Sequence, residues 1–263
     1  MDPIITLTTD FGQSDYDVGV LSGVIWNSAP RARVVDLSHE VARHNVFEAA
    51  LLLDRCTPYF PDGTIHVAVV DPGVGTERRG IAARLGAQWF VGPDNGLITL
   101  MHRRAQAAEQ PIEIVQLNRP RYRLAEVSHI FHGRDVFAPA AAHLAAGVPL
   151  AELGDPISDP VLLEIPTPER GERGWRGVVM HVDAFGNLST NLERQQIEHT
   201  GKIAIHLRDA RIEGLVRTFG EAEPGELVAL FDSSGKLSVC VVNGDAAARL
   251  KARVGDPVEV FLE

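Results

Sequence analysis

Cysteine is scarce in this sequence. The 263 residues include two cysteines, Cys56 and Cys240, and neither belongs to a Cys-x-x-Cys pair. Disulfide frameworks and cysteine-based zinc sites need several thiols at close spacing. We therefore expect two reduced, buried thiols, and neither a disulfide-stapled fold nor a zinc site.

Long apolar runs and clusters of positive charge are missing as well. No stretch of about 18 apolar residues could form a transmembrane helix, and the start, Met1-Asp2-Pro3, has no basic and apolar signal segment. The formal net charge is −10, with 25 Lys and Arg against 35 Asp and Glu, whereas nucleic-acid binding needs clustered Lys and Arg. We expect a cytoplasmic protein that binds a small molecule, with no nucleic acid and no membrane as partner.

The chain does contain enough apolar residues for a core, at 45% of its length, and its strand and helix patterns alternate. Such alternation is typical of the α/β class, and it predicts a three-layer α/β/α domain with a mostly parallel sheet. The expected strands are residues 4–9, 32–37, 64–70, 81–85 and 88–91, and the expected helices are residues 18–25 and 47–55.

The composition changes between residues 156 and 177, where prolines and glycines are interspersed with charges. This change predicts an N-terminal α/β domain over 1–160, a linker over 161–176 and a smaller C-terminal domain over 177–263. The C-terminal part contains short apolar runs at close spacing, which predict an antiparallel β-barrel.

The most informative segment is Val69-Val70-Asp71-Pro72-Gly73-Val74-Gly75-Thr76-Glu77-Arg78-Arg79, which follows an apolar strand pattern. Its proline ends the strand and its glycines allow the backbone to approach a ligand closely. A carboxylate at the carboxyl end of a strand, followed by such a turn, is typical of ligand sites in α/β sheets. The alternative interpretation is a surface turn with a solvated Asp–Arg pair.

Two other predicted strands also end near a carboxylate. Asp10 and Asp36 would lie with Asp71 along one edge if the strands are parallel. Three carboxylates at one edge would also fit a Mg²⁺ site. We rank this alternative low, because Arg78 and Arg79 would compete for the same carboxylates.

Polar residues also precede an alanine-rich helix pattern near residue 138. His132 lies in a Gly- and Arg-containing run there, and the polar start of a helix can hold an anion or orient an imidazole. His129 and His143 are interpreted as structural histidines. Further along, Asp183 and Asn187 form a polar turn, which Asx hydrogen bonds alone would explain.

Together, five segments resemble the S-adenosylmethionine (SAM) hydroxide adenosyltransferases, also called SAM hydrolases (adenosine-forming), which are relatives of the SAM-dependent fluorinase and chlorinase. The resemblance spans nearly the whole chain, in order. The five segments are Thr9-Asp10-Phe11-Gly12, the Asp71–Arg79 segment, Gly92-Pro93-Asp94-Asn95-Gly96, Phe131-His132-Gly133-Arg134-Asp135 and Asp183-Ala184-Phe185-Gly186-Asn187.

The resemblance implies that the chain hydrolyses SAM to adenosine and methionine, without a metal or other cofactor. It also implies a homotrimer with SAM at the subunit interfaces, between the N-terminal domain of one subunit and the C-terminal domain of the next. Asp10 would hold the ribose hydroxyls, and Asp183 and Asn187 would bind the methionine part. The implied set is completed by Ser233, at the amino-acid part, and by the stretch from Asn243 to Ala246, at adenine through its backbone.

The residues that match the family's water-handling triad are Asp71, Arg78 and His132. The halogenating relatives have a tyrosine where Asp71 stands and lack the Arg–His pair, so hydrolysis is favoured over halide transfer. The aromatic residue that follows the fluorinase turn is also absent, since Leu188 and Ser189 stand there. Halide-dependent SAM cleavage and a SAM-binding sensor without turnover remain the alternatives.

The chemistry of a sulfonium explains why such a triad suffices. Methionine leaves without a general acid, so the site must place a water in line with the C5′–S bond and remove its proton. Arg78 keeps its proton at all physiological pH values and can only stabilise developing hydroxide character. Asp71 and His132 both remain candidates for the base.

Overall fold

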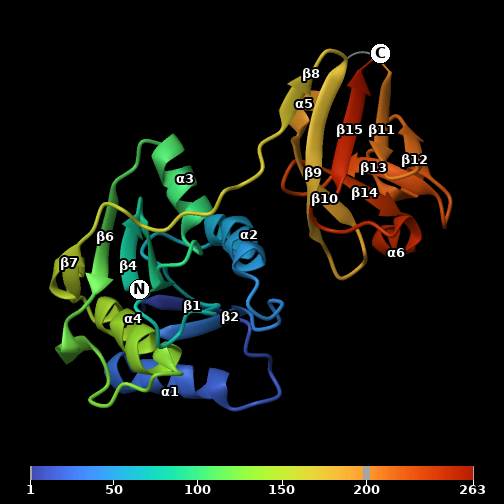
Figure 1. Ribbon diagram of the computed structural model, residues 1–263. Coiled ribbons are helices and arrows are strands. Elements are labelled where there is room, and N and C mark those ends of the chain that lie inside the picture. Colours follow the sequence, from blue (N-terminus) through green and yellow to red (C-terminus); the bar gives the residue numbers. More distant parts are fainter. Residues whose placement is uncertain (1, 198–201, 263) are drawn as a thin grey trace. The chain divides into compact units, whose positions relative to one another are not determined.

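The computed structural model describes residues 2–197 and 202–262, and the chain divides into two compact units, Met1–Leu163 and Glu164–Glu263 (Figure 1). Within the described residues, no helix is both long and apolar enough to cross a bilayer. Cys56 and Cys240 are both unpaired. Cys240 is buried, and burial raises the pKa of its thiol to about 12, whereas Cys56 is only partly buried.

The first unit is an α/β domain, as predicted, built on a mixed sheet with the strand order β2-β1-β3-β5-β4-β6-β7. The first four strands in this order are parallel neighbours, and the last three add antiparallel pairings. The elements are β1 (Ile4–Thr9), α1 (Asp17–Ser28), β2 (Arg33–Ser38), α2 (Val46–Cys56), β3 (Ile65–Val69), β4 (Gly80–Leu85), β5 (Gln88–Pro93), α3 (Thr99–Ala107), β6 (Ile112–Leu117), α4 (Ala138–Ala145) and β7 (Gly154–Pro156).

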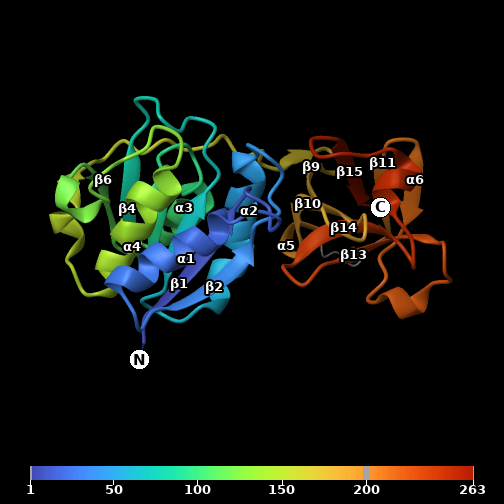
Figure 2. The ribbon, with the colours of Figure 1, turned by 90° about the horizontal axis from the view of Figure 1, so that it is seen from below.

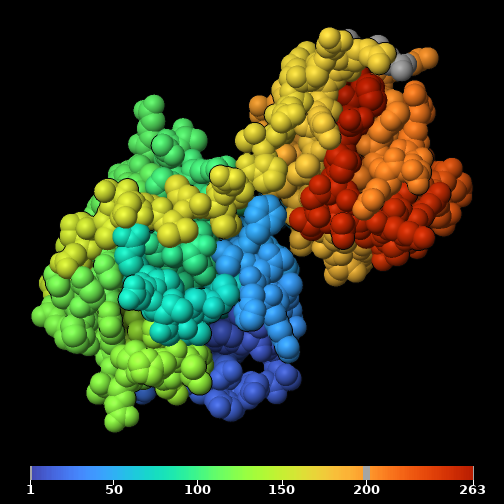
Figure 3. Space-filling view, in the orientation of Figure 1, coloured from blue at the N-terminus to red at the C-terminus, as the bar shows by residue number. Residues whose placement is uncertain are grey.

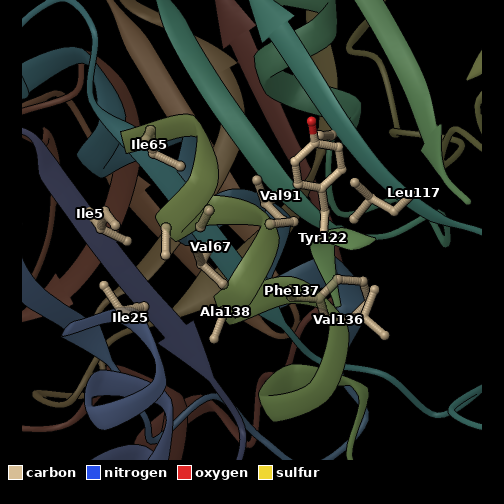
Figure 4. Close-up of a cluster of buried hydrophobic side chains, with 14 of the residues drawn as sticks. Ile5, Ile25, Ile65, Val67, Val91, Leu117, Tyr122, Val136, Phe137 and Ala138 are labelled. Carbon is tan, nitrogen blue, oxygen red and sulfur yellow. The ribbon is translucent and has the colours of Figure 1, made fainter. Parts of the chain in front are cut away.

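Helices cover both faces of this sheet, which gives the three layers that the sequence predicts. Helices α1 and α4 lie side by side on one face (Figure 2), and α2 and α3 pack on the other. On the first face, Ile5 and Val67 from the strands meet Ile25 and Phe137 in one buried cluster (Figure 4). Each such side chain contributes about 1.5–3 kcal/mol when it is fully buried. The sheet is therefore a rigid base for the loops at its edge.

Parallel pairing brings the carboxyl ends of β1 and β3 to the same edge. In the register of these strands, Thr9 lies beside Val69, so Asp10 and Asp71 leave the sheet near each other. Asp36 differs from the prediction, because β2 continues to Ser38 and Asp36 pairs within the strand with Leu7. Only two of the three expected carboxylates therefore begin loops at this edge.

The second unit is a barrel-like antiparallel sheet with the path β12-β11-β15-β9-β10-β14-β13. Its two end strands, β12 and β13, lie close to each other, and just after β12 the amide of Val216 donates to the carbonyl of Ala229 in β13 at 2.9 Å. Strand β8 and the start of β9 lie within the segment that we expected as a linker. The elements are β8 (Glu169–Gly171), β9 (Gly174–Val182), β10 (Leu188–Glu193), α5 (Arg194–Ile197), β11 (Ile203–Leu207), β12 (Ala210–Glu213), β13 (Leu227–Phe231), β14 (Lys236–Val241), α6 (Ala246–Leu250) and β15 (Pro257–Leu262).

Candidate active site

A pocket of about 450 Å³ lies at the sheet edge where β1 and β3 end. Its lining includes Asp10, Asp71 and His132, together with the aromatic rings of Phe11 and Phe131. The segment after β3 (cyan) lies at the surface of the first unit in the space-filling view (Figure 3). The pocket combines apolar walls with a few convergent charged groups, which is typical of small-molecule sites.

One arginine links the two ionisable residues at the base of this pocket. The Arg78 Nε donates to both carboxylate oxygens of Asp71, at 2.9 and 3.0 Å, and its Nη2 forms a further ion pair with the same carboxylate. Nη2 also lies 2.9 Å from Nδ1 of His132. The side chains of Asp71 and Arg78 are only 5% and 12% exposed, so this pairing is largely shielded from water. The structure therefore brings the three residues predicted to handle water into one hydrogen-bonded set.

The contact with Arg78 decides where His132 carries its proton. A guanidinium has only donors, so Nδ1 of His132 accepts this hydrogen bond, and the proton of the neutral ring sits on Nε2. Burial lowers the pKa of His132 below its ordinary value, and the positive charge of Arg78 lowers it further. His132 is therefore neutral at pH 7 and presents an N–H donor from Nε2.

A glycine allows the loop after β3 to reach the segment that carries His132. Gly75 has a φ of +76°, and a Cβ placed on it would lie 2.1 Å from the carbonyl oxygen of His129. Any side chain at this position would therefore force the two segments apart. This contact involves the backbone of His129, so it does not depend on the imidazole.

The segment after His132 forms a π-helical turn, Gly133–Phe137, before α4 begins. Asp135 is fully buried in this turn and accepts hydrogen bonds from the amide of Ser128 at 2.7 Å and from Nε of Arg134 at 2.6 Å. The ring of Phe137 lies under the guanidinium of Arg78, at 5.2 Å. Turns of this kind are frequent at functional sites. Sequence reasoning placed a helix start here, but it did not identify the supporting role of Asp135.

The two neighbouring arginines have different partners. Arg79 turns away from the pocket and donates to Asp94 at 2.8 Å and to Asp159 at 2.8 Å. Asn95 donates to the carbonyl of Val70, directly before Asp71, at 2.9 Å. The Gly92–Gly96 segment therefore holds the chain on both sides of the Asp71 turn by hydrogen bonds, and none of its residues lines the pocket.

Asp10 is held by a backbone amide. His44 has the left-handed φ of +63°, and its N–H donates to Oδ2 of Asp10 at 2.8 Å. Asp71 instead pairs with Arg78, and Asp36 lies near His39. The three carboxylates thus have three different partners. Among the described residues there is no group of three or more His, Cys, Asp or Glu side chains that could hold a metal.

In the second unit, the predicted methionine-binding residues form a tight turn. Oδ1 of Asp183 accepts from the amides of Phe185 and Asn187, both at 2.9 Å, and Oδ2 accepts from the side-chain amide of Asn187 at 2.9 Å. The Asx hydrogen bonds of the simpler interpretation are therefore present. Phe185, at the tip of this turn, is 77% exposed.

The other predicted residues of this unit lie around the same turn. The amide of Ala247 donates to the carbonyl of Gly186 at 3.0 Å, which brings the start of α6 against it. Ala246 is fully buried, so its side chain is closed to a ligand, whereas Asn243 is exposed with a φ of +54°. Ser233 is exposed in a neighbouring turn.

That neighbouring turn is organised by Asp232, which was not among the predicted site residues. Asp232 accepts from the amides of Ser234 and Lys236, at 2.9 and 3.0 Å, and from the hydroxyl of Ser189 at 2.8 Å. Burial raises the pKa of its carboxyl, but these bonds and a further one from the hydroxyl of Ser234 outweigh it and leave the pKa below its ordinary value. Asp232 followed by Ser-Ser-Gly was the available signal, since an acid before such a run is typical of an Asx turn.

Comparisons with known proteins cover nearly the whole chain. Residues 5–154 match the model of the SAM hydroxide adenosyltransferase N-terminal domain, and residues 177–259 match that of the C-terminal domain. An (R)-S-adenosyl-L-methionine hydrolase of Salinispora arenicola is 41% identical over 98% of this chain and 97% of the relative. A fluorinase of Actinopolyspora mzabensis is 30% identical over 90% of each chain. The crystal structure of an uncharacterized conserved protein from Thermotoga maritima has a TM-score of 0.89 at 34% identity, covering 98% of this chain and 99% of that one.

Proposed function

The chain belongs to the SAM hydroxide adenosyltransferase family, and on that premise we propose that it hydrolyses S-adenosyl-L-methionine at C5′ to adenosine and L-methionine. The observation that carries this proposal is the hydrogen-bonded set of Asp71, Arg78 and His132 at a ligand-sized pocket. The name of the Salinispora arenicola relative, a SAM hydrolase at 41% identity, supports the same reaction.

The reaction needs a water and a place for its proton. The oxygen of water attacks C5′ as the C5′–S bond breaks, and the sulfonium leaves with the bonding pair as neutral methionine. The Nε2–H of His132 is a donor, so it can hold the water oxygen but cannot take the proton in this arrangement. Asp71 is the other candidate for the base in the water-handling set, and its carboxylate also lines the pocket, so we assign it as the acceptor of the proton. Arg78 stabilises the hydroxide character that develops meanwhile.

The remaining predicted residues are proposed to bind the substrate. Asp10 faces the pocket and keeps Oδ1 available for a ribose hydroxyl, because the amide of His44 occupies Oδ2. For the methionine part we propose Asp183, Asn187 and Ser233, and for adenine the backbone from Asn243 to Ala246.

We also propose a homotrimer, in which the pocket of one subunit is completed by the second unit of a neighbour. The support is the family resemblance, together with the fact that the water-handling residues and the predicted methionine-binding residues belong to different units of the chain. A cyclic trimer joins unlike surfaces head to tail, as such a site requires. The cytoplasmic location stays a prediction.

Chromatography of a reaction with SAM in halide-free buffer tests the proposed function. We expect adenosine and methionine in equal amounts, because water is the only nucleophile required. The matched reaction contains chloride or fluoride at the same ionic strength, and the product should not change. Formation of 5′-halo-5′-deoxyadenosine only with halide would instead identify halide transfer, and binding of SAM without products would identify a sensor.

A further inference from the structure

Asp10 is supported by a buried network that includes His39, a residue to which the proposed reaction gives no role. The imidazole of His39 and the side chain of Thr9 are each 1% exposed. Nδ1 of His39 lies 2.9 Å from the Thr9 hydroxyl oxygen, and that oxygen accepts a hydrogen bond from the amide of Phe11 at 3.2 Å. The Thr9 hydroxyl therefore closes a short turn around Asp10.

The same histidine connects the two loops that meet at Asp10. Its carbonyl accepts a hydrogen bond from the amide of Gly12 at 2.8 Å, so the chain after Asp10 is attached to the chain after β2. Five residues further on, the amide of His44 donates to the Asp10 carboxylate. On its other side, Nε2 of His39 lies 3.1 Å from Oδ1 of Asp36, an ion-pair distance without hydrogen-bond geometry.

We propose that His39 is a positioning residue for Asp10 and acts on it through the hydroxyl of Thr9. The imidazole fixes the rotamer of this hydroxyl, the hydroxyl fixes the amide of Phe11, and the turn directs the Asp10 carboxylate into the pocket. The inference rests on the proposed function, in which Asp10 holds the ribose hydroxyls. The inference gives a role to His39, which directly follows β2. His39 neither lines the pocket nor belongs to the water-handling set.

Two pairs of variants separate this role from a general effect on folding. Thr9→Val keeps the shape but removes the hydroxyl, whereas Thr9→Ser keeps it. His39→Asn places an amide group near the position of Nδ1, where it can still contact Thr9. His39→Gln places its amide near the position of Nε2, toward Asp36. Thr57→Val is the matched control, because Thr57 is also a fully buried threonine of the first unit whose hydroxyl is hydrogen-bonded, to Arg104 at 2.6 Å, and it does not line the pocket.

Steady-state kinetics with SAM are measured for each variant, alone and combined with Asp10→Ala. We expect Thr9→Val and His39→Gln to raise KM about five- to tenfold, the equivalent of one lost hydrogen bond, with kcat within about twofold. Thr9→Ser, His39→Asn and Thr57→Val should stay within about twofold of the wild-type KM. In the Asp10→Ala background, Thr9→Val should add nothing further, because both act on the same contact.

Three results would overturn the inference. The first is a normal KM for Thr9→Val and His39→Gln while Asp10→Ala weakens binding. The second is an undiminished effect of Thr9→Val in the Asp10→Ala background, which would indicate a purely structural role. The third is an equal KM for His39→Asn and His39→Gln, because only the asparagine variant is expected to keep the contact with Thr9. This comparison tests the inference even if Thr9→Val does not fold. Failure of the proposed function is distinguishable, since wild type would then release no adenosine at all.

Discussion

Arg78→Ala is expected to lower kcat by at least about 100-fold while KM for SAM changes by less than about threefold. Arg78 contacts Asp71 and His132 at once, so its removal releases both from their present geometry. None of the three is proposed to bind the adenosyl or methionine groups, so substrate affinity should survive. Stopped-time assays of adenosine at several SAM concentrations measure both constants.

Two further variants sharpen this test. Arg78→Lys keeps the positive charge, but the single nitrogen of lysine cannot replace the guanidinium, which contacts Asp71 through two nitrogens and also reaches His132. The kcat of this variant should therefore fall between those of wild type and the alanine variant. Arg84→Ala is the control, because Arg84 is a partly exposed arginine whose pair with Glu113 is 3.5 Å long and worth little. The alanine variant also leaves the Asp71 carboxylate buried without its partner, so its melting temperature must be measured beside wild type. A folded Arg78→Ala with normal kcat would remove Arg78 from the mechanism.

A mixture of two inactive variants is expected to regain activity. Asp71→Ala damages the pocket of the first unit, and Asn187→Ala damages the turn of the second unit. If neighbouring subunits complete each site, random co-refolding gives about a quarter of sites two intact faces. The measured turnover should therefore rise from near zero to about a quarter of the wild-type value.

The mixed trimers must be verified by mass, and each variant refolded alone serves as the control. If both faces of a site belonged to one chain, every site would keep one defect and mixing would recover nothing. Mixed trimers without recovery would therefore exclude the shared site. Absence of any trimer would exclude the proposed assembly itself.

Local sequence patterns predicted the α/β domain and its sheet edge well, because apolar runs and strand-ending residues act over a few positions. The limits of β1 agree with the prediction, and those of β3 do so within one residue at each end. The limits of β2 lie one residue later at each end than the predicted 32–37, and pairing of Asp36 with Leu7 keeps this carboxylate inside the strand. The result is a site edge with two carboxylate loops where three were expected.

The connections within the site were harder to predict than its members. Arg78 and Arg79 are identical in type and adjacent in sequence, and only the fold shows that one meets Asp71 and the other Asp94. The proton position on His132 likewise depends on a partner 54 residues away. The contact of Thr9 with His39 spans 30 residues and carries no local signal. Such contacts arise from tertiary packing between segments that are far apart in the chain, so short stretches of sequence do not predict them.

The most direct measurement of the central claim is the origin of the 5′-oxygen of adenosine. SAM is incubated with the enzyme in ¹⁸O-labelled water, and the product is examined by mass spectrometry with fragmentation of the ribose. Attack of water on C5′ predicts label at the 5′-oxygen, in the isotopic proportion of the solvent, and no label in methionine. Adenosine with an unlabelled 5′-oxygen would contradict direct attack by water at C5′.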